Sequence, residues 1–171
     1  MSIRTDYSYQ ARLGIPGTLY DISPHAIDSR QNAEDAAGVM RFGIGVMQGD
    51  TPGTNVRVPA AGDTLATFEG LSMGSQTFDM NMEGELKVRP HQTVGVLRWG
   101  RAWARVASGL TIKYGEPVFL IISGDDAGLL TNITGAAGSS IALNAMFIGG
   151  LGSGDTAPIE IYNQSNQGGA V

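Results

Sequence analysis

The sequence predicts an all-β protein, an antiparallel β-barrel or β-sandwich with an extended N-terminal arm, and three observations lead to this expectation. Glycine accounts for 25 of the 171 residues, which is roughly twice its usual share. Charged residues make up only 16% of the chain, whereas the surfaces of helical bundles need many of them. Short apolar runs of strand length recur between turn sequences roughly every 8–12 residues, as in barrels and sandwiches.

Composition divides the chain into three parts. Residues 1–38 form the expected arm, residues 39–163 the β-domain, and residues 164–171 a polar tail that is expected to fray. The length of the chain fits one domain. No stretch has the pattern of a signal peptide or the length of a membrane-spanning helix, so we expect no targeting segment and no membrane partner.

The arm itself leaves two interpretations open. Glycines and prolines interrupt every periodic pattern in residues 1–38, yet the segment carries too many tyrosine and aliphatic side chains for a disordered tail. It therefore either orders on a neighbouring molecule or lies on its own domain. Within it, residues 29–37 predict one short helix, capped by Asp28 or Ser29 and ended by Gly38.

From residue 39 onward the pattern becomes typical of strands and tight turns. The expected strands are 39–47, 55–58, 64–71, 92–99, 101–106, 110–112, 118–122, 129–133, 145–148 and 158–162. The strands on either side of Gly100 form either a hairpin or one long strand with a glycine bulge. Residues 72–85 are rich in methionine, glycine and polar side chains, and they predict a long loop or a hairpin excursion.

Charge is distributed unevenly along the chain. The formal net charge of −5 argues against nucleic acid as a partner. Residues 86–115 carry six basic side chains and no acidic one, whereas residues 114–171 carry five acidic side chains and no basic one. Either the protein has two surfaces of opposite sign, suited to protein–protein contacts, or the two segments neutralise each other within one sheet.

Residue sets that support catalysis or metal binding are scarce. The chain has no cysteine, which excludes disulfides, thiolate catalysis and cysteine-based metal sites. His25 and His91 stand far apart, and no Gly-x-Ser-x-Gly motif accompanies them. Asp125 and Asp126 lie in a glycine turn that lacks the further oxygen ligands of a calcium loop. We therefore expect no enzyme, no metal site and no cofactor.

The most informative stretch is residues 101–106. On a strand, alternate side chains point to opposite faces, so two alanines and a valine point one way and the Arg-Trp-Arg row of Arg101, Trp103 and Arg105 points the other. Tryptophan and arginine are enriched at the centres of protein interfaces. The alternative is a core tryptophan between two arginines that extend to water. A stacking platform for single-stranded nucleic acid would need more than one such row.

Five short motifs occur in order along the chain. They are Tyr7-Ser-Tyr9, Ala37-Gly-Val-Met-Arg-Phe-Gly43, Phe68-Glu-Gly70, the run from Val94 to Val106, and Gly115-Glu-Pro-Val-Phe119. In this order they resemble the structural cement, or capsid decoration, proteins of tailed bacteriophages. The resemblance spans most of the chain, although residues 72–87 and 135–154 match no motif of that family.

The resemblance implies an all-β domain on the outer surface of the phage head that clamps neighbouring major capsid proteins and carries no cofactor. Such a protein is made in the host cytoplasm and becomes part of the virion. We expect a homo-oligomer, a trimer rather than a dimer. The candidate contact residues of the arm and the row are Tyr7, Tyr9, Arg12, Leu19, Tyr20, Arg101, Trp103 and Arg105.

Three other functions fit parts of the sequence. A carbohydrate-binding or host-attachment β-sandwich could use Trp99 and Trp103 as sugar platforms. A small β-barrel hydrolase would need a buried histidine hydrogen-bonded to an acid, and the sequence offers no candidate for it. A neck or tail component of a phage would share most of the features of a head protein.

Overall fold

Strands make up nearly all of the regular structure in the computed structural model, which describes residues 14–35, 40–74, 88–135, 139–152 and 155–162. The elements are β1 (Ala26–Asn32), β2 (Gly45–Gln48), β3 (Asn55–Arg57), the 3-10 turn η1 (Leu65–Thr67), β4 (Phe68–Met73), β5 (Thr93–Arg105), β6 (Pro117–Ile121), β7 (Leu130–Thr131), β8 (Ser140–Phe147) and β9 (Thr156–Ile161). The predicted all-β class is confirmed.

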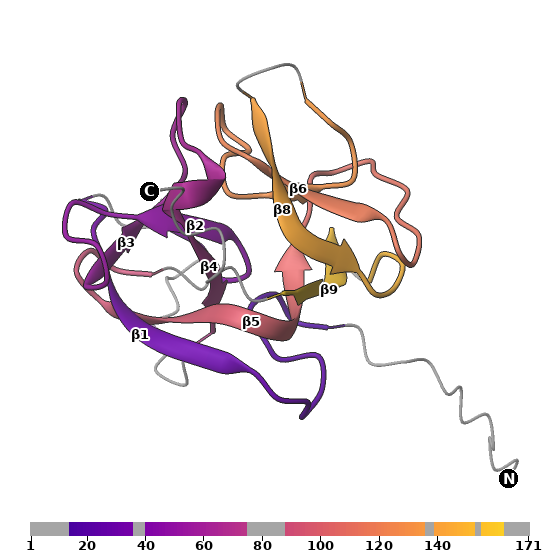
Figure 1. Ribbon diagram of the computed structural model, residues 1–171, viewed down its shortest axis with the longest axis horizontal. Helices are drawn as coiled ribbons and strands as arrows, with labels where there is room; N and C mark the ends of the chain where they lie inside the picture. Colours follow the sequence, from indigo (N-terminus) through magenta and orange to yellow (C-terminus); the bar gives the residue numbers. More distant parts are fainter. Residues whose placement is uncertain (1–13, 36–39, 75–87, 136–138, 153–154, 163–171) are drawn as a thin grey trace, which may run out of the picture.

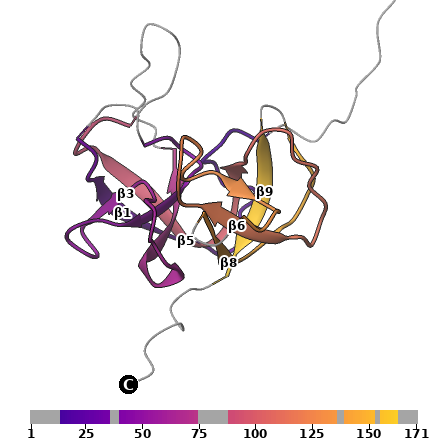
Figure 2. The same cartoon turned by 90° about the horizontal axis from the view of Figure 1, so that it is seen from above.

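The first five strands close into a small barrel. Strand β1 pairs with β3, and the order continues through β2 and β4 to β5, which pairs antiparallel with β1 again. Only the pairing of β1 with β3 is parallel. The remaining strands extend the sheet in the order β5, β9, β8, β6 and β7, and form a second body beside the barrel (Figures 1 and 2).

Strand β5 belongs to both halves of the molecule. Its first part pairs with β1 and β4, and its second part, from Gly100, pairs with β9. Of the two predicted alternatives, one long strand is the right one, but its bulge lies at Arg98 and not at Gly100. The register against β1 shifts at Arg98, since Ile27 lies opposite Leu97 and Ala26 lies opposite Trp99.

Gly100 is required where β5 turns from one sheet to the next. Its φ of 126° lies in a region that favours glycine. A Cβ atom at this position would lie 2.6 Å from the Cβ of His25.

The predicted helix over residues 29–37 is wrong, because Ser29 to Asn32 belong to β1. Side chains of β1 alternate between the outside and the inside of the barrel, but both sets are mostly polar, so the sequence shows no alternation of apolar and polar residues. The inward side chains find polar partners instead. The Asn32 amide, for example, donates to the carbonyl oxygen of Arg89. The expected arm of residues 1–38 thus includes a strand of the barrel.

Other strand boundaries also differ from the prediction. The segment predicted as strand 39–47 forms a strand only from Gly45, although Met40, Phe42 and Ile44 are buried. Residues 110–112 form no strand, and β8 begins at Ser140, five residues earlier than predicted. The predicted excursion at residues 72–85 and the polar tail lie largely or wholly outside the described residues.

Two apolar clusters fill the molecule. One fills the barrel and consists of Met40, Phe42, Ile44, Val46, Val56, Val88, Val94 and Val96. The other lines the second sheet and reaches the outside of the barrel, with Phe147, Leu120 and Leu97 among its members. The two halves meet closely, since a Cβ atom at Gly45 of the barrel would lie 2.5 Å from Leu120 in the second half.

Four charged side chains occupy one end of the barrel. The Glu69 carboxylate accepts hydrogen bonds from Arg30 at 2.9 Å and from Arg98 at 2.6 Å, and its side chain is only 2% exposed. Asp28 lies 2.9 Å from Arg30 and 3.7 Å from Arg98. Bases and acids from distant parts of the chain therefore neutralise each other here.

A second ion pair should make the stability of the protein depend on pH. Two nitrogen atoms of Arg57 donate to the Asp63 carboxylate at 2.8 and 2.6 Å. The pKa of Asp63 lies below its ordinary value, mainly because of the hydrogen bonds from Arg57. A hydrogen bond from the backbone N–H of Ala60 lowers this pKa further. Because the folded pKa is the lower one, the stabilisation is present above the unfolded pKa and is lost as the pH falls through the folded pKa.

We expect the urea midpoint of the protein to fall between pH 7 and pH 3, and the substitution Asp63→Asn to reduce that fall. Asn cannot titrate, so the variant lacks this contribution at both pH values. The matched control is Asp35→Asn, at an exposed carboxylate. Equal pH dependence in the wild type and in the Asp63→Asn variant would contradict the expectation.

Candidate protein-binding surface

The Arg-Trp-Arg row lies on the outer side of β5, as the alternation predicted. Ala102 and Ala104 are fully buried, whereas Arg101, Trp103 and Arg105 are half-buried. The prediction of which side chains face inward is therefore confirmed. What covers the outer side is the chain's own N-terminal segment.

Residues 17–20 add a short outer strand to β5. The N–H of Gly17 donates to the carbonyl oxygen of Trp103 at 2.8 Å, and the N–H of Trp103 donates to Thr18 at 2.9 Å. The N–H of Tyr20 donates to Arg101 at 3.0 Å, and Leu19 forms an isolated bridge with Ala102 in antiparallel register. This part of the expected arm thus lies on its own domain.

The Trp103 indole is packed between neighbours from two other segments. Gly14 lies directly over the ring, because a Cβ atom there would overlap the indole. The Tyr20 ring lies at an angle to the indole, with centroids 5.6 Å apart. A Cβ atom at Gly152 would come within 3.1 Å of the ring. A glycine at residue 14 is therefore what lets the N-terminal segment cross Trp103.

The arginines of the row are also engaged within the chain. Arg101 donates to Asp21 and to Glu160, both at 3.2 Å, and thereby links the N-terminal segment to β9. Arg105 donates from Nε to the carbonyl oxygen of Phe42 at 3.0 Å. Asp21 also accepts from the N–H and the hydroxyl of Ser23, and these bonds, more than Arg101, lower its pKa.

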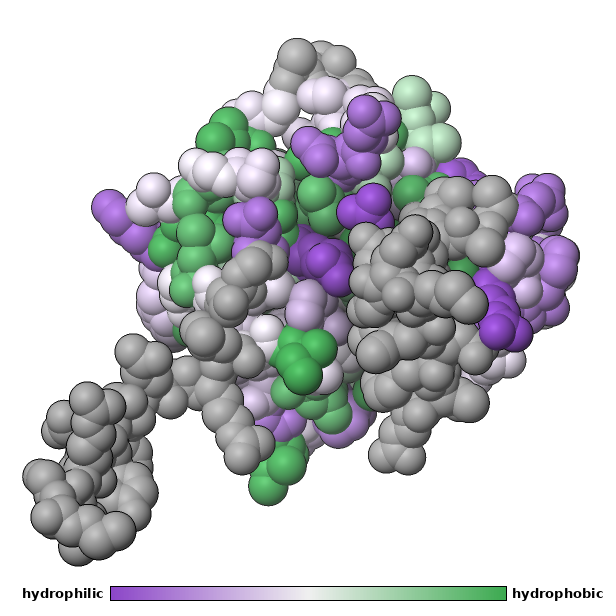
Figure 3. Space-filling model, turned by 180° about the vertical axis from the view of Figure 1, so that it is seen from behind, coloured by the Kyte–Doolittle hydropathy of each residue, from purple (hydrophilic) through white to green (hydrophobic). Residues whose placement is uncertain are grey.

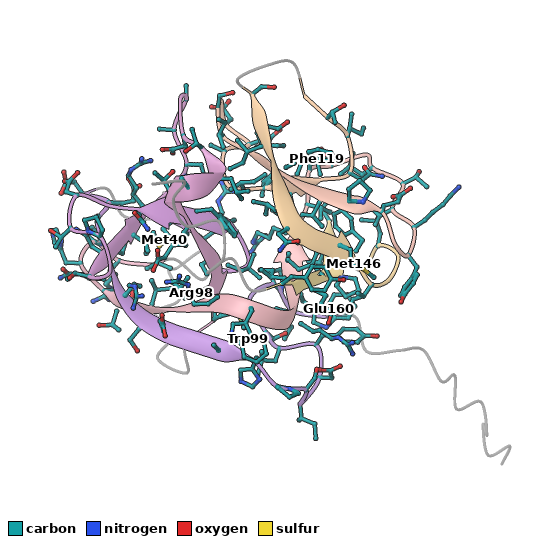
Figure 4. All side chains as sticks on the ribbon, in the orientation of Figure 1. Met40, Arg98, Trp99, Phe119, Met146 and Glu160 are labelled. Carbon is teal, nitrogen blue, oxygen red and sulfur yellow. The ribbon has the colours of Figure 1, made fainter. Side chains whose placement is uncertain are left out.

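We call the area around Arg101 the Arg101 surface. It consists of Arg101, its ion-pair partners Asp21 and Glu160, and Tyr20, whose backbone N–H donates to the carbonyl oxygen of Arg101. Burial first, and then Glu160 and Tyr114, raise the pKa of Tyr162, while Arg101 lowers it. Figure 4 shows Glu160 beside Met146, its cross-strand partner on β8.

The predicted contact residues have different surroundings in the structure. Tyr7, Tyr9 and Arg12 lie outside the described residues. Leu19 packs partly buried against the larger apolar cluster, and Tyr20 remains 44% exposed. Sequence reasoning missed Ile22, because exposure depends on the tertiary structure; the turn sequence from Asp21 to Pro24 was the available signal.

Groups that would support other functions are sparse in the part of the chain that the structure describes. His25 binds the carbonyl oxygen of Ser23 at the surface, and His91 lies in a turn with a φ of 57°. No group of three metal-ligating side chains occurs among these residues, and no helix among them is long and apolar enough to cross a membrane.

A groove of about 810 Å³ lies between the N-terminal segment and the barrel. Its walls include Leu19, Ile27 and Met73, and all of its lining residues are uncharged and non-aromatic. Neither tryptophan lines it, so this groove lacks the aromatic platform that a sugar-binding site uses.

Comparison with known proteins agrees with the resemblance seen in the sequence. A family model described as structural cement protein (E217 gp24/Pam3 gp6) matches residues 3–162. A chain from a solved structure titled "The capsid of Myoviridae Phage XM1" is similar, with a TM-score of 0.68 and 18% sequence identity. The alignment covers 94% of this chain and 98% of that one, which shows a shared fold. No curated protein sequence matches.

The family match spans nearly the whole sequence, including both halves of the structure and the N-terminal segment that covers Trp103. The chain therefore belongs to the structural cement proteins of bacteriophages and has a structural, capsid-stabilising role.

Proposed function

We propose that this protein binds the outer surface of the phage head and bridges neighbouring major capsid proteins through its N-terminal arm and the row on β5. The observation that carries the proposal is the attachment of residues 17–20 to β5. The attached segment follows directly after residues 1–13, with Tyr7, Tyr9 and Arg12, which we assign to the contact with a partner. Thirteen residues span up to roughly 45 Å when extended, enough to reach beyond one subunit.

The proposal includes a homo-oligomer, because several arms on one oligomer bind more tightly than one arm alone. We propose a trimer rather than a dimer. It assigns no catalytic role and no nucleic-acid partner, in keeping with the net charge of −5. In this proposal the protein is made in the host cytoplasm and becomes part of the virion. Hundreds of copies per virion, counted by mass spectrometry, would support the head; six or twelve copies would indicate the neck or tail instead.

Deletion of residues 1–13 is expected to weaken binding to expanded empty shells at least tenfold, because the arm adds a second contact to the same partner. Binding is measured by co-sedimentation, and by the rise in the melting temperature of the shells. The matched control removes residues 164–171, the polar tail at the other end of the chain. Full occupancy of the shells by the protein without its arm would contradict this role of the arm.

A further inference from the structure

We infer that the turn after Tyr20 is a preformed anchor, and that Ile22 at its tip inserts into an apolar pocket of the capsid shell protein. This inference rests on the proposed function and assigns the contact to particular atoms of the domain. Ile22 is 100% exposed, and no other large apolar side chain among the described residues is exposed to this extent. Isolated exposed apolar residues are common, so the argument depends on how this one is held.

Hydrogen bonds on both sides of Ile22 hold the turn in shape. The Asp21 carboxylate accepts from the N–H of Ser23 at 2.9 Å and from its hydroxyl, and so closes a turn around Ile22. One ring nitrogen of His25 lies 2.9 Å from the carbonyl oxygen of Ser23. The turn is thus built locally and does not need a partner to form.

The same turn is fixed to the body of the protein. Asp21 accepts a hydrogen bond from Arg101 of β5, and Tyr20 packs on Trp103. His25 lies against Gly100, where a Cβ atom would be only 2.6 Å away. Figure 1 shows this segment as the indigo loop that projects at the lower end of the molecule. A side chain presented on a fixed support loses little conformational freedom on binding.

The residues next to the turn that carries Ile22 include an arginine and an exposed tyrosine. Arg101 binds Asp21, and Tyr20, which packs on Trp103, is 44% exposed. Tyrosine and arginine are enriched among the residues that dominate binding energy. In Figure 3, apolar surface protrudes at the lower end of the molecule, where Figure 1 shows the projecting loop.

The shell protein is the partner that fits the position of the turn. The turn follows directly on residues 17–20, which are bonded to β5, and the residues of the proposed arm precede them in the same segment of the sequence. Membership in the cement family makes capsid proteins the partners of this chain. A contact through Ile22 therefore continues the interface that we propose for the arm. The ions of the Arg101 surface are paired within the chain, so a partner pocket needs apolar lining rather than charge.

The test compares Ile22→Ser with Ile133→Ser, a matched change at a 60% exposed isoleucine in the loop after β7. Binding to expanded empty shells is measured for the full chain, together with melting temperature and sedimentation velocity of the free protein. We expect Ile22→Ser to bind roughly 30-fold more weakly, the loss that corresponds to one buried isoleucine. Ile133→Ser should bind within twofold of the wild type, and both variants should keep the wild-type melting temperature.

Three results would overturn the inference, and they can be told apart. Wild-type affinity of Ile22→Ser for the shells would show that the turn is not the anchor, while the proposed function stands. A smaller sedimentation coefficient of the free Ile22→Ser variant would show that Ile22 contacts a second copy of this chain instead. Failure of the wild type itself to bind shells would reject the proposed function, and the inference with it.

Discussion

Replacing Gly70 with alanine is expected to destabilise the protein by about 4 kcal/mol, the largest effect of any single methyl group that we predict. Gly70 lies in β4 between β2 and β5, and its φ is 152°. An added Cβ atom would overlap the carbonyl oxygen of Leu97 and lie 2.8 Å from Val96. Backbone strain and overpacking therefore act together, and neither β4 nor β5 can move away without opening the barrel.

Thermal unfolding measures this effect directly. For a chain of this length, about 4 kcal/mol corresponds to a fall of about 12 °C in the melting temperature. Gly150→Ala is the matched control, since an added Cβ atom there meets only an ordinary contact at 3.5 Å. A Gly70→Ala variant that melts within 2 °C of the wild type would show that the barrel accommodates the methyl group.

Strands and their inward faces were predicted correctly from the sequence where one face of the strand is apolar. Residues 101–106 alternate between small buried and large outer side chains, so both the strand and its inward face could be predicted. Gly100 was also informative, because a glycine between two strand patterns indicates a bend or a bulge. The Phe-Glu-Gly motif could be noticed, but its physical reason, a close approach to Leu97, depends on the register of β4 against β5.

The sequence did not predict strand β1, because the inner side of this strand is polar. Strand β1 carries Asp28, Arg30 and Asn32 on its inner side, and its outer side is also mostly polar, so periodicity gave no signal for a strand. The partners of these inner residues come from β4, β5 and the residues before β5, and all of them are at least 39 residues away along the chain. Local preference indicated a helix, and these distant contacts override it.

The candidate surface could be predicted only in part for a similar reason. The sequence singles out Trp103 as either an interface residue or a core residue on a strand, yet nothing local shows that Gly14 and Tyr20 cover it. Conversely, the turn sequence from Asp21 to Pro24 is the one local signal at Ile22, and it does not by itself show that the side chain is exposed. Its exposure follows from the attachment of the neighbouring Asp21 to Arg101.

The polar end of the barrel gives the second large prediction, the substitution Glu69→Gln. The register between β2 and β4 shifts at this point, because Val46 lies opposite Gly70 and Met47 lies opposite Phe68. Glu69 is the extra residue, and its side chain meets both Arg30 and Arg98. Glutamine keeps the size of the side chain but removes the charge that these two arginines share.

We expect Glu69→Gln to cost about 3 kcal/mol, because removing one member of a buried ion pair leaves its partners uncompensated. The lost charge affects Arg30 more than Arg98. The Arg30 side chain is only 13% exposed, whereas the Arg98 side chain is 33% exposed and keeps contact with water. Asp28 remains 2.9 Å from Arg30 and 3.7 Å from Arg98, but it compensates only in part because it is itself 44% exposed to water. The melting temperature should therefore fall by about 9 °C.

Glu160→Gln is the matched control for this prediction. Glu160 also pairs with an arginine, but Arg101 is 39% exposed and has Asp21 as a second partner, so the loss should be much smaller than at Glu69. A loss at Glu69 as small as that at Glu160 would show that water reaches the end of the barrel in solution. If the loss is larger, the ion pairs keep β1 in the barrel, and the polar sequence of β1 is explained by the partners that it must meet inside.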